Sequence, residues 1–247
     1  MRYLVISDIH ANLIAFETVL QDSKDKYDKI WCLGDVVGYG PHPNECVELL
    51  SCHDHLCLAG NHDWAVINRL NVDDFNPNAK FAVLWTREIM TTENLDYLAG
   101  LPDEPIEQES HFTLVHASPR HPIWEYVLYP RIAQLNFAHF QTNYCFVGHT
   151  HSPIVFVESQ IYDTMCDAII PTTERYLQEL DVQRLIINPG SVGQPRDGDP
   201  RASYGILDTD KMEFEIRRVE YNVTEVQDIM KQYNFPPRLW SRLKFGF

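Results

Sequence analysis

The 247-residue sequence has few basic residues: 20 Lys and Arg stand against 35 Asp and Glu, which gives a formal charge of −15. Proteins that wrap a nucleic-acid backbone carry clusters of Lys and Arg, and the sequence contains none. This shortage argues against a DNA nuclease and against any nucleic-acid polymer as a partner. The acidic excess by itself indicates only a solvated surface.

The sequence also lacks long apolar runs and paired cysteines. No stretch approaches the roughly 20 apolar residues of a membrane span, and the opening "MRYLVISDIH" does not follow the pattern of a signal peptide. The six cysteines form no CxxC pair, and Cys32, Cys57 and Cys145 lie in apolar runs, so we expect buried reduced thiols. We therefore expect a soluble cytoplasmic protein that does not bind a membrane.

No internal repeat and no low-complexity linker divides the sequence. A chain of this length fits one large domain or two small ones, and it can bury a large core. The hydrophobic share of 45% is that of an ordinary globular protein. We predict a single domain over residues 1–247.

Short apolar runs predict the central strands. Five of them are nearly continuous, as in strands covered on both faces, and they lie at 2–7, 29–34, 56–60, 112–116 and 144–148. Two segments whose apolar residues have helical spacing separate the first three runs. They lie at 12–22, where Asn12 is the expected N-cap, and at 44–52. This β-α-β-α-β order predicts an α/β fold with a largely parallel central sheet.

The rest of the chain adds helices and strands. The pattern predicts helices at 78–90, 91–101 and 223–233. Four strand patterns with turn residues between them predict antiparallel hairpins, at 153–158, 184–188, 203–208 and 213–221. Segment 158–183 is ambiguous, and we favour an irregular hairpin over a helix because Pro171 and its neighbours interrupt it.

Polar residues follow each of the five apolar runs. They stand in "SDIH", "GD", "GNHD", "VH" and "GHTH", and they are Asp8, His10, Asp35, Asn61, His62, Asp63, His116, His149 and His151. The carboxyl ends of parallel strands lie along one edge of a sheet, where ligands bind, so we expect these side chains to converge. Alternation at the strand tip would turn His149 and His151 the same way, with Thr150 pointing away.

Carboxylates, imidazoles and an amide oxygen in one place suit Mn, Fe, Zn, Co or Ni better than Ca or Mg. Seven such ligands are too many for one tetrahedral ion and fit two ions that share a carboxylate. Two ions about 3.5–4 Å apart polarise a phosphoryl group and lower the pKa of bound water from 15.7 toward ~7. A single His at a strand end is more often an ordinary surface or core residue, but five such strand ends favour a metal site.

The order D-x-H, G-D, G-N-H-[DE], a separate His and G-H-x-H resembles the calcineurin-like metallophosphoesterase superfamily. The match runs from residue 3 to about residue 155, and "NPGSVGQPRDGDPRASYGILD" at 188–208 is similar to its small bacterial and archaeal phosphodiesterase (YfcE-like) branch. The resemblance implies a four-layer α/β/β/α sandwich with a dinuclear metal site. The sequence departs from many members at Gly38, where they carry a second Asp, and this puts in doubt only the shape of the adjoining loop.

The resemblance also implies a role for each residue. One ion would bind Asp8, His10, Asp35 and His151. The other would share Asp35 and add Asn61, His116 and His149. His62 would face the substrate as general acid, and Asp63 would orient it.

We therefore predict a metal-dependent phosphoesterase that hydrolyses a small phosphodiester or nucleotide-type ester. A hydroxide bridging two ions would attack phosphorus, and His62 would protonate the departing oxygen. The alternative from another class is a catalytically silent scaffold with the same fold. Members that have become scaffolds typically lose site histidines, and this chain keeps every ligand and His62.

Three further residues are candidates for contacting the small phosphate-ester substrate: Tyr39, His121 and Arg196. Arg196 would either bind phosphate or pair with its neighbour Asp197. Tyr39 would either stack on a base or pack within its loop. The sequence indicates neither the oligomeric state nor which metal is used.

Overall fold

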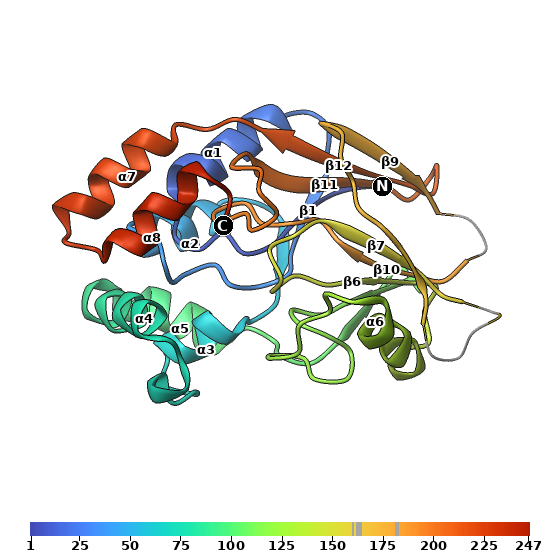
Figure 1. Cartoon of the computed structure of the whole chain (residues 1–247), viewed down its shortest axis with the longest axis horizontal. Coiled ribbons are helices and arrows are strands. Elements are labelled where there is room, and N and C mark those ends of the chain that lie inside the picture. Colours follow the sequence, from blue (N-terminus) through green and yellow to red (C-terminus); the bar gives the residue numbers. More distant parts are fainter. Residues whose placement is uncertain (160, 162–164, 181–182) are drawn as a thin grey trace.

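Two six-stranded sheets pack against each other in the computed structural model, which describes residues 1–159, 161, 165–180 and 183–247 (Figure 1). The first sheet has the order β3-β2-β1-β11-β12-β9 and the second β4-β5-β6-β10-β7-β8. The strands of the first sheet are β1 (Arg2–Ile6), β2 (Lys29–Cys32), β3 (His55–Cys57), β9 (Arg175–Glu179), β11 (Ala202–Asp208) and β12 (Glu213–Val219). Those of the second are β4 (Ile106–Gln108), β5 (Phe112–Leu114), β6 (Tyr144–Phe146), β7 (Ile154–Val157), β8 (Asp167–Ile169) and β10 (Leu185–Asn188).

Helices cover the outer faces of both sheets. They are α1 (Leu13–Asp22), α2 (Pro43–Ser51), α3 (Asn61–Val66), α4 (Pro77–Ile89), α5 (Thr92–Ala99), α6 (Pro130–Asn136), α7 (Val223–Gln232) and α8 (Pro237–Ser241). Short 3-10 turns add η1 (Val72–Asp74), η2 (Phe137–His139) and η3 (Arg242–Lys244). None of the helices in the described part of the chain is both long and apolar enough to cross a bilayer.

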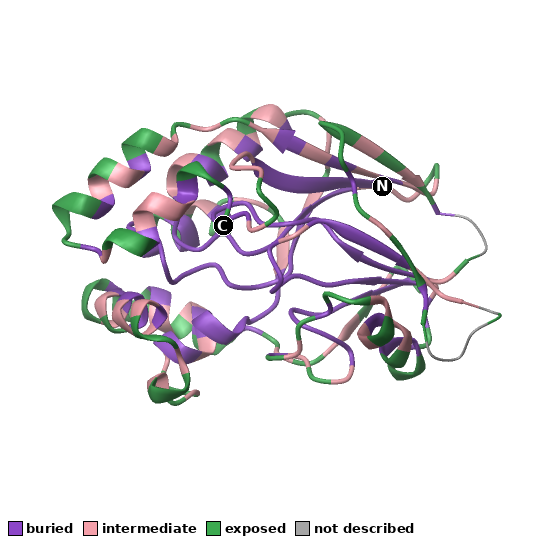
Figure 2. Ribbon diagram, viewed as in Figure 1, coloured by how far each residue is buried: buried purple, intermediate pink, exposed green. Residues whose placement is uncertain are grey.

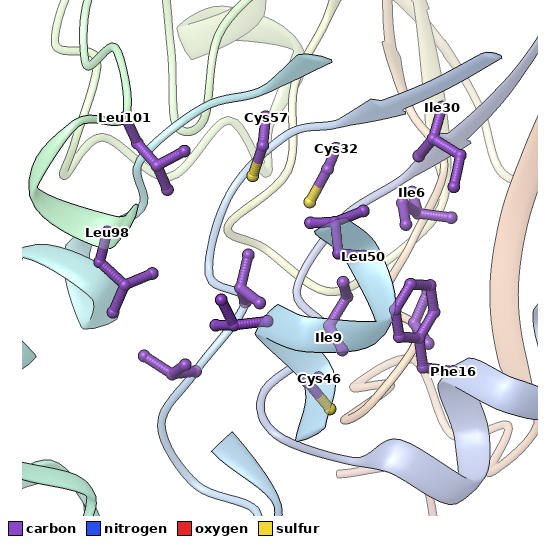
Figure 3. Packing of buried hydrophobic residues seen from close by; sticks show 14 of the residues in the cluster. Ile6, Ile9, Phe16, Ile30, Cys32, Cys46, Leu50, Cys57, Leu98 and Leu101 are labelled. Atoms are coloured by element: carbon purple, nitrogen blue, oxygen red, sulfur yellow. The ribbon is translucent and has the colours of Figure 1, made fainter. Parts of the chain in front are cut away.

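Alternate residues of each strand enter different cores, because successive side chains point to opposite faces. Leu4 and Ile6 pack outward with α1 and α2, and Figure 3 shows Ile6 beside Phe16 of α1. Tyr3 and Val5 pack inward, between the two sheets. This is why the runs are apolar throughout, and Figure 2 shows β10 and β11 buried along their lengths. The predicted four-layer α/β/β/α sandwich is confirmed.

The predicted helices and strands occur within a few residues of the expected bounds. Asn12 caps α1, since its side chain accepts a hydrogen bond of 3.2 Å from the amide of Ala15. Cys32, Cys57 and Cys145 are buried free thiols. The sequence patterns missed α3, α6, α8 and β4, which have seven residues or fewer and are too short for a periodic signal.

The prediction of one largely parallel central sheet is wrong. Parallel pairing joins β1 to β2 and β2 to β3 in the first sheet, and β5 to β6 and β6 to β10 in the second. The other strand pairs are antiparallel, including the predicted hairpin of β11 and β12. An apolar run indicates that both faces of a strand are buried. It does not indicate to which sheet the strand belongs. The five strand ends therefore come from two sheets.

The predicted hairpin in segment 158–183 is also wrong, although strands occur there. β8 pairs with β7 in the second sheet, whereas β9 pairs with β12 in the first. The chain changes sheets between them, where Pro171 cannot donate a ladder hydrogen bond. Residues 160, 162–164 and 181–182 of this segment lie outside the described residues.

Candidate metal centre

The predicted ligands gather where the strand ends of the two sheets meet. Hydrogen bonds join the turns across the two sheets: the His149 amide donates to Asp8 Oδ2 at 3.0 Å, and His116 Nδ1 lies 2.9 Å from the carbonyl of Leu33. Asp8 follows β1 and Leu33 follows β2, whereas His116 follows β5 and His149 follows β6. One site is therefore built from both sheets.

Five of the seven predicted ligands have a left-handed backbone conformation. Their φ angles are 54° at Asp8, 48° at His10, 54° at Asp35, 63° at His149 and 60° at His151. Non-glycine residues adopt this region infrequently, at a cost of order 1–3 kcal/mol each, and they cluster at functional sites. Tight turns rather than continuing strands thus aim the ligand side chains.

The prediction that strand alternation orients the two histidines of "GHTH" is wrong. β6 ends at Phe146, and both His149 and His151 lie in the left-handed turn that follows. The hydroxyl of Thr150 instead accepts a hydrogen bond of 2.9 Å from Asn188. The turn sends the two imidazoles to different parts of the site.

The ligand atoms form two clusters that share Asp35. The first holds Asp8, His10, Asp35 and His151, and the second Asp35, His116 and His149. Within each cluster these atoms lie within 4.8 Å of one another. Asp35 Oδ2 is 3.5 Å from His10 Nε2 and 3.6 Å from His116 Nε2. Asn61 joins the second cluster, with its Oδ1 3.3 Å from His116 Nε2.

Backbone carbonyls fix three of the imidazole rings. Nδ1 of His10 lies 3.1 Å from the Val37 carbonyl, and Nδ1 of His151 lies 2.6 Å from that of Gln194. His116 makes the same kind of contact to Leu33. Because Nδ1 carries the proton that is donated, the Nε2 lone pair is free to ligate. Nε2 of His10 and Nε2 of His151 face each other at 3.1 Å, an arrangement that a shared cation would stabilise.

Three of the ligand atoms have no hydrogen-bond partner in the described part of the chain. Asp8 Oδ1, Asp35 Oδ2 and His149 Nε2 are buried, and no hydrogen bond from the described residues reaches them. Leaving such atoms unpaired costs about 1–3 kcal/mol each, and more for a charge. Their convergence fits the donor set of a divalent transition metal. The residues present therefore fit the metal that the sequence predicts.

Burial sets the protonation of the metal-free site. It lowers the pKa of His10, His149 and His151 well below their ordinary value, and the charge of Arg196 adds to this. Burial also raises the pKa of Asp8 to about 7 and that of Asp35 well above its usual range. The imidazoles are thus neutral at pH 7, while a proton competes with metal for the carboxylates.

This competition predicts a pH dependence of metal uptake. A carboxylate with a raised pKa holds its proton below that pKa, so an ion must displace it. We expect the apparent affinity for Mn²⁺ to fall as the pH drops through about 7, by up to ~10-fold per pH unit for each proton displaced. Calorimetric titration in two buffers of different ionisation enthalpy would count the released protons. Uptake that releases no proton at pH 6 would contradict this.

His62 lies beside the first cluster but does not belong to it. Its ring centroid is 4.9 Å from that of His10 and 4.3 Å from that of Tyr39. Its Nδ1 is buried without a hydrogen-bond partner among the described residues. Gly38, with φ of 86°, packs against this ring, since a Cβ there would lie 2.6 Å from Nδ1. The loop that departs from the family pattern thus forms one wall around His62.

The prediction that Asp63 orients His62 is wrong. The Asp63 carboxylate accepts from the backbone amides of Asp35 at 2.8 Å, Gly60 at 2.9 Å and Val37 at 3.1 Å. Consecutive side chains on a helix diverge by about 100°, so Asp63 faces the 35–37 loop instead of the imidazole. Asp63 is a positioning residue for Asp35.

Of the three residues predicted to contact substrate, Tyr39 and Arg196 lie near the first cluster and His121 does not. Tyr39 stands over the first cluster, with its ring centroid 4.7 Å from that of His10, and Arg196 Cζ lies 5.6 Å from the Tyr39 centroid. Arg196 does not pair with Asp197, whose carboxylate binds Arg218. His121 lines a separate cavity of about 290 Å³ in which no predicted ligand takes part.

Tyr126 is a site residue that the sequence patterns did not predict. Its ring packs at a tilt against His149, with centroids 4.0 Å apart and an interplanar angle of 30°. Burial raises the pKa of its hydroxyl. The one signal was an aromatic residue in the loop after His116, which did not separate a site residue from ordinary packing.

Comparisons with known proteins agree on one family. The sequence profile of the Calcineurin-like phosphoesterase superfamily domain matches residues 1–212. An uncharacterised protein from Methanocaldococcus jannaschii is 41% identical over 247 residues, which cover 98% of this chain and 97% of that one.

Two solved structures are similar to this chain over its whole length. A metallophosphoesterase from Sphaerobacter thermophilus is 47% identical with a TM-score of 0.90, over 100% of this chain and 99% of that chain. A hypothetical protein from Pyrococcus horikoshii OT3 has a TM-score of 0.76 at 18% identity, covering 100% and 98%. At that identity the second likeness concerns the fold alone.

Proposed function

Because the chain belongs to the calcineurin-like phosphoesterase superfamily, we propose that it hydrolyses small phosphate esters, of the phosphodiester or nucleotide type, with two divalent transition-metal ions. The observation that carries this proposal is the position of Asp35 between two clusters of buried ligand atoms. A single structural ion would not need the second cluster. A silent scaffold would have no reason to keep unpaired carboxylate oxygens buried beside neutral imidazoles.

The chain divides the ligands between two ions. Asp8, His10, Asp35 and His151 would hold one, and Asp35, Asn61, His116 and His149 the other. When bound, such ions neutralise charge on a phosphoryl group and lower the pKa of water toward ~7. The fixed Nδ1 contacts hold the imidazoles in place, so little reorganisation is needed when an ion enters.

Arg196 and His62 supply the remaining chemistry. Arg196 Cζ lies 5.6 Å from the centroid of the Tyr39 ring, which is itself 4.7 Å from that of His10, so its guanidinium would donate to a phosphoryl oxygen held beside the first cluster. Burial and the charge of Arg196 lower the pKa of His62 well below its ordinary value. The ring is therefore neutral at pH 7 in the free protein. The negative charge of a bound phosphate ester would favour the protonated form, which would pass its proton to the leaving oxygen and regain one from solvent.

A substrate screen with the Mn-loaded protein tests the proposed function. We expect a higher kcat/KM on bis(p-nitrophenyl) phosphate, nucleotides and dinucleoside polyphosphates than on phosphopeptides or duplex DNA. The charge of −15 repels polyanions at long range, whereas a small anion is held locally by the ions. Preference for phosphopeptides or duplex DNA at physiological salt would overturn the substrate class. Turnover of no phosphate ester at all would favour the scaffold alternative.

A further inference from the structure

A cavity with positively charged walls lies next to the candidate metal centre. It is a cavity of about 250 Å³, and its polar walls come from Tyr39, the start of α4, and two arginines near the C-terminus, Arg238 in α8 and Arg242 in η3. Figure 1 shows α8 and α4 at the same end of the molecule. No residue of the two ligand clusters lines this cavity.

Among the described residues, the arginines of this region have no side-chain carboxylate as a partner. Elsewhere in this acidic chain, Arg184 pairs with Glu158 at 3.1 Å and Arg201 with Asp199 at 2.7 Å. In the described part of the chain, no side-chain carboxylate lies within ion-pair distance of Arg238, Arg242 or the neighbouring Arg196. Unpaired cations packed together in a protein with 35 acidic residues point to an anionic ligand.

Arg242 has a main-chain acceptor on one side only. Its Nε donates to the main-chain oxygen of Phe247, the last residue of the sequence, and no other acceptor for its guanidinium occurs among the described residues. Burial and the charge of Arg196 lower the pKa of Arg242 to about 10. A bound anion would relieve the repulsion between these guanidinium groups.

Helix α4 favours an anion at the same place. The cavity is lined by Asn76, Pro77 and Asn78, at the N-terminus of this 13-residue helix. The Asn76 side chain caps the first turn by accepting from the amides of Asn78 and Ala79 at 3.1 Å. The helix therefore contributes the positive end of its dipole and adds to the field of the two arginines.

Tyr39 connects the cavity with the candidate metal centre. Its side chain lines the cavity, and the same ring lies 4.3 Å from His62 and 4.7 Å from His10 between centroids. One aromatic ring therefore separates an anion in the cavity from the reacting groups. A single small molecule with two phosphate groups would have to pass this ring to occupy both places.

We propose that Arg238, Arg242 and Tyr39 form a subsite for a second phosphate group of the substrate, one that is not hydrolysed. The substrate class is then a nucleotide-type ester with at least two phosphate groups, such as a nucleoside bisphosphate or a dinucleoside polyphosphate. The assignment of the group as part of a substrate rests on the proposed function, whereas the binding of a second phosphate does not.

Calorimetry with a matched pair of nucleotides tests the subsite. Adenosine 3′,5′-bisphosphate and AMP differ by one phosphate, and each would be titrated into metal-free and Mn-loaded protein. We expect the wild type to bind the bisphosphate about 10- to 100-fold more tightly, the usual value of charged hydrogen bonds. The variant Arg238→Gln/Arg242→Gln should bind both nucleotides equally, and Arg238→Lys/Arg242→Lys should keep part of the preference.

Two controls make the result specific. The variant Arg175→Gln/Lys211→Gln also removes two positive charges, from side chains that are 65% and 67% exposed and outside the cavity, and it should keep the wild-type preference. Thermal unfolding would show that the Arg238/Arg242 variants remain folded. Equal affinities of the two nucleotides for the wild type, or a preference that survives in Arg238→Gln/Arg242→Gln, would overturn the subsite.

A substrate with one phosphate separates the two proposals. Replacing both arginines (Arg238→Gln/Arg242→Gln) should lower kcat/KM far less on bis(p-nitrophenyl) phosphate than on adenosine 3′,5′-bisphosphate, because the diester has no second phosphate group. An equal loss on the two substrates would show that the arginines serve the reaction centre and contradict a separate subsite. If the wild type hydrolyses no phosphate ester, the proposed function fails, while calorimetry still decides whether the second phosphate is bound.

Discussion

Asp35→Ala is expected to abolish both metal sites and to reduce turnover by about 10³-fold or more. Asp35 is the one residue that both ligand clusters contain, and its loss removes several kcal/mol of charge stabilisation in the transition state, at 1.36 kcal/mol per tenfold in rate. Elemental analysis after reconstitution with Mn²⁺, together with kcat on a nitrophenyl diester, measures both effects.

Asn61→Ala is the matched control for this experiment. Asn61 contacts His116 of the second cluster at 3.3 Å and is absent from the first. It should therefore weaken the binding of one ion and leave the other near its wild-type occupancy. If Asp35→Ala keeps two ions, or if Asn61→Ala loses both, the division of ligands between two ions is wrong.

His62→Ala is expected to lower turnover by about 10²–10⁴, the usual contribution of a general acid, while metal content stays near wild type. The His62 side chain contacts the first cluster through ring packing on His10 and belongs to neither set of ligand atoms. Its backbone amide donates to Asp35 Oδ1 at 2.8 Å, a contact that the alanine variant keeps. The loss should shrink with nitrophenyl esters, because a nitrophenolate departs without a proton. A fall in metal content as large as the fall in activity would mean that His62 is a ligand.

Asp63→Asn provides the contrast to His62→Ala. The Asp63 carboxylate holds the amides of Asp35, Val37 and Gly60, so its replacement should disturb the loop that carries Asp35. We expect reduced metal occupancy as well as reduced turnover, and this loss should not depend on the leaving group. Comparing the two variants thus separates the loss of the general acid from the loss of the contacts that position Asp35.

Residue type and order were enough to predict which side chains would meet. Each of the five buried runs has a carboxylate, amide or imidazole at its end, and burial of both strand faces is visible in the sequence as an uninterrupted apolar run. The structure places all seven predicted ligands together. The prediction of these ligands succeeded although it assumed a single sheet, because the strand ends of both sheets lie at the same place.

The parts that could not be predicted depend on tertiary contacts. His149 and His151 lie in a left-handed turn, which no apolar periodicity encodes. Two of the three amides that Asp63 binds, those of Asp35 and Val37, come from the packing of α3 against the 35–37 loop, whereas that of Gly60 belongs to the N-cap of α3. Arg238 and Arg242 follow no motif and lie far from Tyr39 in sequence, so only the fold shows that they share a cavity.

The most direct test is the rate of bis(p-nitrophenyl) phosphate hydrolysis as Mn²⁺ is added to metal-free protein. We expect no measurable rate without metal and a rise that levels off at two ions per chain, with Asp35→Ala inactive throughout. A rate that is independent of metal, a plateau at one ion per chain, or no hydrolysis at full occupancy would contradict a dinuclear phosphoesterase centre.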